Sequence, residues 1–193
     1  MIEALILAAG SSIRMGEQNK LTLPWKESTM IRTSVNAALE SHVDRVIVVT
    51  GHQHGEVKRA LQGLPIDIVH NPTHRLGQVG SIQAGVSMLS QQMSTFLVCL
   101  GDMPRLTSAL INKVIDSHLN ENFLITRPVN DHQVGHPVIM NSSLREQVLA
   151  YTDAHTMRPF MKARANQLQQ ISTQESGYFM DIDTPSDYQK WSI

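Results

Sequence analysis

A glycine-rich segment near the amino end of the chain combines small residues with two cations. It contains Leu7, Ala8, Ala9, Gly10, Ser11, Ser12 and Arg14, followed by Lys20. Gly10 and its small neighbours allow backbone N–H groups to approach phosphate closely, and Arg14 and Lys20 can neutralise phosphate charge. The segment has neither the Gly-Lys-Ser/Thr ending of a Walker A loop nor the dinucleotide pattern Gly-x-Gly-x-x-Gly. It predicts binding of a nucleoside triphosphate, although a plain Gly/Ser turn with solvent-exposed cations has the same composition.

An aspartate follows the most apolar run of the chain. Asp102 comes shortly after Phe96–Leu100, so it should lie at the carboxyl edge of a sheet, beside the glycine-rich segment. Mg²⁺ prefers hard oxygen ligands, commonly one or two carboxylates together with substrate phosphates. We therefore predict Asp102 as a Mg²⁺ ligand and, with Arg14 and Lys20, as a catalytic residue. The alternative is that Asp102 caps a helix that begins near Thr107.

A second acidic segment lies near the carboxyl end. Asp181 and Asp183 point to the same side of the chain if this segment is extended. Either could complete a metal site with Asp102, and we favour Asp183 because it lies nearer the following turn. The alternative is that Asp183 or Thr184 caps a helix that begins at Pro185.

Two further segments are candidates for the walls of a site. The first places polar and small residues at the start of a predicted helix, suited to contact with a base or ribose: Asn71, Gly80 and Ser81. The second is a tight polar turn before a strand, which we assign to acceptor binding: Gly135, His136 and Pro137. Ordinary turn chemistry is the alternative for both.

Short apolar runs rich in β-branched residues alternate with longer runs of helical period, which is typical of an α/β protein with a parallel sheet covered by helices. The predicted strands are Ala4–Leu7, Arg45–Thr50, Ile66–Val69, Thr95–Leu100, Phe123–Thr126, Pro137–Met140 and Gly177–Ile182. The predicted helices are Met30–Ser41, Gly55–Gln62, Gly80–Leu89, Ser108–His118, Ser143–Ala150, Thr156–Arg164 and one from Pro185. Since no linker or repeat interrupts them, we expect one domain over residues 1–193. Residues of about 1–127 would bind the nucleotide, and about 128–193 would supply the acceptor side and the last metal ligand.

Composition restricts the class of protein. The 193 residues carry a formal net charge of -1, which argues against nucleic acid as a partner. Cys99 is the only cysteine and lies in an apolar run, so we expect a buried thiol and no intramolecular disulfide. No apolar stretch reaches the length of a membrane helix and no leader pattern is evident, so we expect no membrane association and a cytoplasmic location.

Taken together, these motifs resemble the nucleotidyltransferases that activate the molybdenum cofactor. The resemblance covers nearly the whole chain and rests on Leu7 to Gly16, Lys20, Leu23-Pro24-Trp25, Val49-Thr50-Gly51, His70-Asn71-Pro72, Gly101 to Pro104, Gly135-His136-Pro137 and Asp181 to Pro185. It implies the Rossmann-like, three-layer fold of nucleotide-diphospho-sugar transferases, with a mostly parallel sheet. It also implies that Gly51 contacts the nucleotide.

The resemblance is to the cytidylyltransferase branch in particular, which Ala8-Ala9-Gly10 favours over the guanylyltransferase branch. It implies Mg²⁺-dependent transfer of CMP from CTP to the terminal phosphate of molybdopterin carrying molybdenum, with release of pyrophosphate. A molybdenum hydroxylase would be the candidate recipient of the product. Transfer from GTP, transfer to a sugar or polyol phosphate, and a non-catalytic role in cofactor delivery or nucleotide sensing remain the alternatives.

Overall fold

The apolar runs of the sequence form a seven-stranded sheet, in the strand order β5-β4-β1-β6-β8-β7-β9. The computed structural model describes residues 1–11, 15, 19–152 and 155–191. The strands are β1 Ile2–Ala8, β4 Arg45–Thr50, β5 Asp67–His70, β6 Thr95–Leu100, β7 Ile125–Val129, β8 Val138–Asn141 and β9 Leu168–Ser172, and a separate hairpin pairs β2 Pro24–Trp25 with β3 Ser28–Thr29. β1 is parallel to both β4 and β6, whereas β8 runs antiparallel between β6 and β7. The sheet is mostly parallel, as predicted, and strands from both parts of the chain share it.

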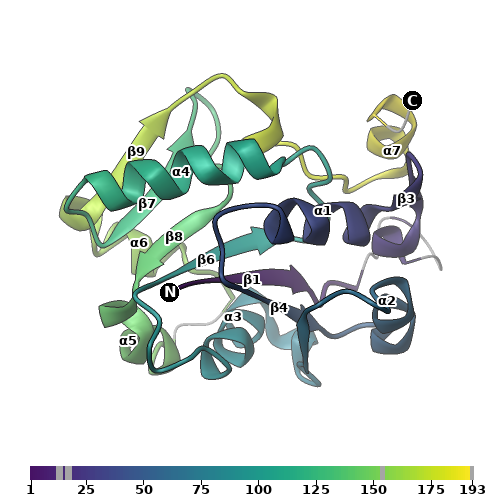
Figure 1. Ribbon diagram of the computed structural model, residues 1–193, viewed down its shortest axis with the longest axis horizontal. Helices are drawn as coiled ribbons and strands as arrows, with labels where there is room; N and C mark the ends of the chain where they lie inside the picture. Colours follow the sequence, from purple (N-terminus) through teal and green to yellow (C-terminus); the bar gives the residue numbers. More distant parts are fainter. Residues whose placement is uncertain (12–14, 16–18, 153–154, 192–193) are drawn as a thin grey trace.

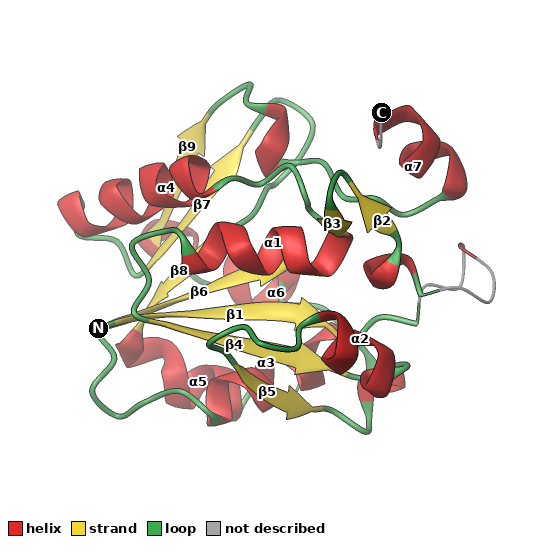
Figure 2. Cartoon of the chain, turned by 45° about the vertical axis from the view of Figure 1, so that its right-hand side comes forward, coloured by secondary structure: helices red, strands yellow, loops and turns green. Residues whose placement is uncertain are grey.

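Helices cover both faces of this sheet, which gives three layers (Figure 1). They are α1 Met30–Leu39, α2 His54–Ala60, α3 Gln78–Ser87, α4 Ser108–Asn120, α5 Arg145–Leu149, α6 Arg158–Lys162 and α7 Pro185–Trp191. One apolar cluster joins alternate strand residues to α1, α2 and α4, and a second joins the intervening residues to α3, α5 and α6. The pattern follows from the period-two alternation of side chains in strands that are buried on both faces. Figure 2 shows α1 and α3 on opposite sides of β1 and β4.

The carboxyl-terminal third departs from the predicted elements. The strand predicted over Gly177–Ile182 is wrong, because Ser176–Tyr178 forms a 3₁₀ turn and no strand follows it there. The buried hydrophobic residues of this segment, Tyr178 and Ile182, are not part of the sheet. The Tyr178 hydroxyl donates to the Leu110 carbonyl at 2.9 Å. The last strand is instead β9, which the sequence analysis missed. β9 is a partly exposed edge strand that pairs only with β7, so its apolar signal is weak.

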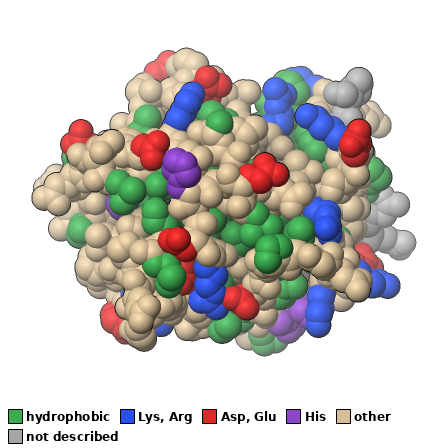
Figure 3. Space-filling model, viewed as in Figure 1, with side chains coloured by type: hydrophobic (Ala, Val, Ile, Leu, Met, Phe, Trp, Pro, Cys, Tyr) green, Lys and Arg blue, Asp and Glu red, His purple; other side chains and the backbone are tan. Residues whose placement is uncertain are grey.

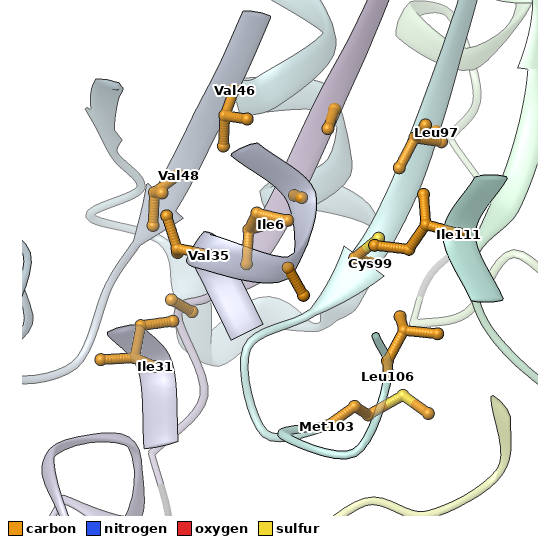
Figure 4. Close-up of a cluster of buried hydrophobic side chains, with 14 of the residues drawn as sticks. Ile6, Ile31, Val35, Val46, Val48, Leu97, Cys99, Met103, Leu106 and Ile111 are labelled. Carbon is orange, nitrogen blue, oxygen red and sulfur yellow. The ribbon is translucent and has the colours of Figure 1, made fainter. Parts of the chain in front are cut away.

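The buried core also fixes a loop that follows β6. Figure 4 shows Ile31 and Val35 of α1 and Ile111 of α4 directed toward strand residues that include Ile6 and Cys99. Met103 and Leu106 extend the same cluster beyond the end of β6, and their exposed fractions are 2% and 4%. The loop that carries Asp102 is therefore anchored on both sides by packed side chains.

The surface agrees with the nearly balanced composition. On the face drawn in Figure 3, acidic and basic side chains are interspersed rather than gathered into a region of one sign. Within the described residues, none of the helices combines the length and the apolar character that crossing a membrane requires.

Candidate active site

A lysine bridges two aspartates at the carboxyl edge of the sheet. The Lys20 Nζ lies 2.5 Å from Asp102 Oδ2 and 2.7 Å from Asp183 Oδ1. These residues come from segments that are 82 and 163 positions apart from Lys20 in the sequence. The structure thus brings together three of the residues that the sequence analysis selected.

Each member of this cluster is held by its own local structure. Lys20 begins a 3₁₀ turn, Lys20–Thr22, which the buried Asn19 caps by accepting from the Leu21 N–H at 3.0 Å. Asp183 is placed by its neighbour, because the Ile182 N–H donates to the Asp102 carbonyl at 3.0 Å. Ile182 is fully buried beside Trp25 of β2, which ties the acidic segment to the hairpin.

The capping alternative is wrong for Asp102, whereas of the two residues considered for the cap of α7 the structure shows Thr184. Thr107 caps α4, since its side chain accepts from the Leu110 N–H. Thr184 Oγ1 accepts from the Asp187 N–H at 3.1 Å in the first turn of α7. Hydroxyl groups therefore perform both caps, and Asp102 and Asp183 face Lys20 instead.

The electrostatics of the cluster reflect burial and close charges. Burial acts to lower the pKa of Lys20, but the charges of Asp102 and Asp183 and the hydrogen bonds to them outweigh it and raise that pKa. Burial, followed by the negative charges of Asp183 and Asp102, raises the pKa of Asp181. Lys20 is therefore held as an ammonium ion among carboxylates.

The donor set of this cluster fits a divalent cation that keeps water and phosphate ligands. Asp102 Oδ1 is buried, and within the described residues it has no hydrogen-bond partner. A buried carboxylate oxygen normally has a partner, so this atom is available as a ligand. In the described part of the chain no three His, Cys, Asp or Glu side chains form a metal-binding group. Two carboxylates suit Mg²⁺, which commonly takes its remaining ligands from phosphate and water.

The end of β1 and the first residues of the glycine-rich segment lie between the loops that follow β4 and β6. A Cβ added at Gly51 would come within 2.7 Å of the Ala9 carbonyl oxygen, so only glycine allows this close approach. A Cβ at Gly101 would lie 3.1 Å from the Leu7 carbonyl oxygen, which accepts from the Gly101 N–H at 2.9 Å. Among the described residues, no atom would lie within 4 Å of a Cβ at Gly10. Leu7 and Ala8 are buried in β1.

Part of the predicted phosphate loop lies outside the described residues. Ser12 and Arg14 fall in this part, so their predicted contacts with phosphate stay predictions. Ser11 is described and is half-buried.

Asn71 and Ser81, both predicted to contact the nucleotide, are bonded to one another. The Asn71 Nδ2 donates to Ser81 Oγ at 3.0 Å, and both residues are buried. Asn71 Oδ1 also accepts from the backbone and hydroxyl of Thr73. Gly80 leaves room beside this pair, because a Cβ there would lie 3.7 Å from Asn71 Nδ2. The pair fixes the turn before α3 at the edge of the sheet.

The turn predicted to bind the acceptor closes against a distant segment. The His136–Pro137 bond is cis, and the His136 N–H donates to the Tyr178 carbonyl at 2.9 Å. A Cβ at Gly135 would come within 2.5 Å of that same carbonyl oxygen. Burial lowers the pKa of His136, whose ring Nδ1 lies 3.2 Å from the Val98 carbonyl. The turn thus holds the segment around Tyr178 in place.

Beside this turn lies a cavity of about 1110 Å³. His136 is in its wall, together with Asp181, which is next to Ile182 and close to Asp102. The cavity also has lining residues that the sequence analysis did not select: Arg127, Arg158, Lys162, Tyr178 and Phe179. A space of this size can hold a small molecule adjacent to the carboxylates.

Solved structures with this architecture include a nucleotidyl transferase. The chain superimposes on a nucleotidyl transferase from Methanothermobacter thermautotroptrophicus with a TM-score of 0.85 at 26% identity, covering 100% of this chain and 96% of that chain. A 4-diphosphocytidyl-2C-methyl-D-erythritol synthase from Anaerococcus prevotii DSM 20548 shares the fold with a TM-score of 0.74 at 19% identity, covering 99% of this chain and 94% of that chain. The fold and the site together define a nucleotidyltransferase.

The chain belongs to the family of MobA-like NTP transferase domains, whose model matches residues 4–170. It is 32% identical over 188 residues to the molybdenum cofactor cytidylyltransferase of Escherichia coli (strain K12), covering 97% of this chain and 93% of that relative. The family resemblance seen in the motifs and the predicted three-layer α/β fold are both confirmed.

Proposed function

We propose that this nucleotidyltransferase transfers CMP from CTP to the terminal phosphate of molybdopterin that carries molybdenum, with release of pyrophosphate. The observation that carries the proposal is the similarity to the cytidylyltransferase of Escherichia coli, which extends over 97% of the chain. This chain also carries Ala8-Ala9-Gly10, the three-residue pattern that favours the cytidylyltransferase branch. A molybdenum hydroxylase is the candidate recipient of the product.

The proposed cofactor is Mg²⁺, held by Asp102 and Asp183. When bound, it would neutralise charge on the phosphates during transfer. The unpartnered Asp102 Oδ1 and the neighbouring Asp183 carboxylate supply oxygen donors of the kind Mg²⁺ takes.

The residues of the chain position the reactants and stabilise charge. Lys20 carries a retained ammonium group at the carboxyl edge, where it can interact with the leaving pyrophosphate, and Arg14 is assigned the same role. A phosphate acceptor is already ionised near neutral pH, so attack on the α-phosphorus needs no protein nucleophile and no general base. The Gly10 backbone, where an added Cβ would meet no described atom within 4 Å, would bind the triphosphate.

Release of pyrophosphate by the purified protein tests this function. Molybdenum cofactor serves as the acceptor, with CTP, GTP, ATP and UTP supplied separately, and each reaction is run with and without Mg²⁺. We expect release with CTP only and only with Mg²⁺. Release with GTP alone would support nucleotidyl transfer but contradict the assignment of CTP as the donor.

The acceptor is tested by a second arm with CTP and a polyol phosphate. Transfer to the polyol phosphate but not to the molybdenum cofactor would contradict the proposed acceptor. Binding of CTP without turnover on either acceptor would contradict both acceptors and point to another acceptor or to a binding protein.

A further inference from the structure

The cavity beside the carboxylates extends well beyond the point of phosphate transfer. Its floor includes Leu100 and Val98 of β6 and reaches Met140 of β8, which pairs with Phe96. Leu100 and Phe96 are four residues apart, which corresponds to about 13 Å along the strand. The cavity is therefore long enough for the body of an acceptor whose phosphate lies at the sheet edge.

The cavity also extends across the sheet. Its lining residues include members of β6, β8, β7 and β9, which are neighbours in that order. Strands lie about 4.8 Å apart, so Arg127 of β7 is about 10 Å from the backbone of β6. Arg127 pairs with Gln170 of β9, and both side chains line the cavity.

Positive charge gathers on this far side. Arg127 from β7 and Arg158 and Lys162 from α6 line the cavity, and Asp181 is its only acidic lining residue within the described part of the chain. Among the described residues, none of the three cations forms an ion pair with a carboxylate. The cavity therefore carries an excess of positive charge away from the site of transfer.

Arg127 has an additional unsatisfied group. Its Nε is buried and has no hydrogen-bond partner among the described residues. A buried donor without a partner is unfavourable, and a guanidinium group is suited to two parallel hydrogen bonds with an anion. The two exposed cations of α6, which line the same cavity, could support such an anion.

We propose that Arg127, assisted by Arg158 and Lys162, binds an anionic group of the acceptor and selects acceptors that carry one. This inference rests on the proposed function, because it assumes that the cavity holds the acceptor. The anionic group is the molybdenum-bearing group, because the phosphate of the acceptor lies at the sheet edge, two strands away from Arg127. The apolar floor of Val98, Val138 and Met140 would contact the uncharged part of the molecule.

Equilibrium binding of purified molybdenum cofactor and of metal-free molybdopterin, without nucleotide, tests the subsite. We expect Arg127→Gln to weaken binding about tenfold or more, as loss of a charge-assisted hydrogen bond predicts, and Arg127→Lys to weaken it less. Weakening confined to the molybdenum-loaded form would assign the anion to the metal-bearing group. Equal weakening of both forms would exclude the metal-bearing group as the anion that Arg127 binds.

Kinetics separate a role in selectivity from a structural role. In Arg127→Gln and in Arg158→Gln, the KM for the acceptor should rise while kcat and the KM for CTP stay near the wild-type values. Lys113→Gln, an exposed cation on α4 across the sheet, is the matched control and should change none of these. Arg158 is exposed, so its variant should fold even if Arg127→Gln is unstable.

Two outcomes would overturn the inference. If Arg127→Gln and Arg158→Gln bind the cofactor as well as the wild-type protein does, the proposed subsite is wrong and the proposed function stands. If wild-type protein binds neither form of the acceptor, the proposed acceptor and the subsite are both wrong.

Discussion

Replacing Lys20 by methionine removes the cation that the two aspartates share. Asp102 Oδ2 and Asp183 Oδ1 both lie within 2.7 Å of the Lys20 Nζ. Without it, two negative charges about 5 Å apart would repel by about 3 kcal/mol at an effective dielectric constant of about 20. The side chains of the three residues are 10%, 18% and 27% exposed, so solvent screens them only in part. A loss of about 3 kcal/mol also lies at the lower end of the range for breaking a buried ion pair.

Urea unfolding measures this loss. We expect Lys20→Met to lower the free energy of unfolding by about 3 kcal/mol, whereas Lys113→Met, which removes an exposed cation on α4, should change it by less than about 0.5 kcal/mol. Addition of Mg²⁺ should stabilise Lys20→Met more than wild type, because the cation would occupy the freed position between the carboxylates.

A double-mutant cycle decides whether repulsion is the cause. Adding Asp183→Asn to Lys20→Met removes one of the two facing charges, so part of the lost stability should return. If Asp183→Asn instead destabilises both backgrounds equally, the two carboxylates do not interact as described. A loss in Lys20→Met no larger than that in Lys113→Met would refute the reasoning outright.

Three further predictions concern other parts of the chain. A Cβ at Gly51 would lie 2.6 Å from that of His74, so Gly51→Ala should cost about 1–3 kcal/mol in urea unfolding and weaken CTP binding. Its control is Gly55→Ala in α2, where the added Cβ meets no atom within 4 Å and should stabilise the protein by about 0.5–1 kcal/mol. Burial lowers the pKa of His118, so the unfolded chain takes up a proton at higher pH than the folded chain, and stability should fall as pH drops below about 6.5. His118→Gln should make that fall shallower in unfolding measured at about pH 7.5 and about pH 5.5, and an unchanged slope would contradict the assignment. Asp102→Asn should lower kcat for CMP transfer by about a hundredfold or more with a smaller effect on folding, and a fully active variant would exclude the proposed metal role.

The positions of Lys20, Asp102 and Asp183 could be predicted because strand topology constrains them. Residues that follow parallel strands meet at one edge of the sheet, so a lysine after β1 and an aspartate after β6 are brought close together. The choice of Asp183 over Asp181 was less certain, because both lie in the same short segment. The structure places Asp183, and not Asp181, in an ion pair with Lys20.

The cationic side of the cavity could not be predicted from the sequence. Arg127 lies in a strand, and Arg158 and Lys162 lie in a short helix about 30 residues later, with no spacing that relates them. They share a cavity only because β8 turns back between β6 and β7 and α6 packs on the same face. The strand predicted over Gly177–Ile182 is wrong for the same reason, namely that tertiary packing is not visible in the local pattern. Tyr178 and Ile182 are buried at a spacing that is compatible with a strand, but they pack beside the sheet.

The contact between Lys20 and Asp183 joins residues that are 163 positions apart. Closing a loop of that length is entropically costly, and the strands between the two residues must already be paired to offset the cost. A chain still emerging from the ribosome would therefore present the glycine-rich segment and Lys20 long before Asp183 exists to face them. The complete carboxylate pair is thus a property of the finished fold, so Mg²⁺ binding at the proposed site would report that the last segment has docked.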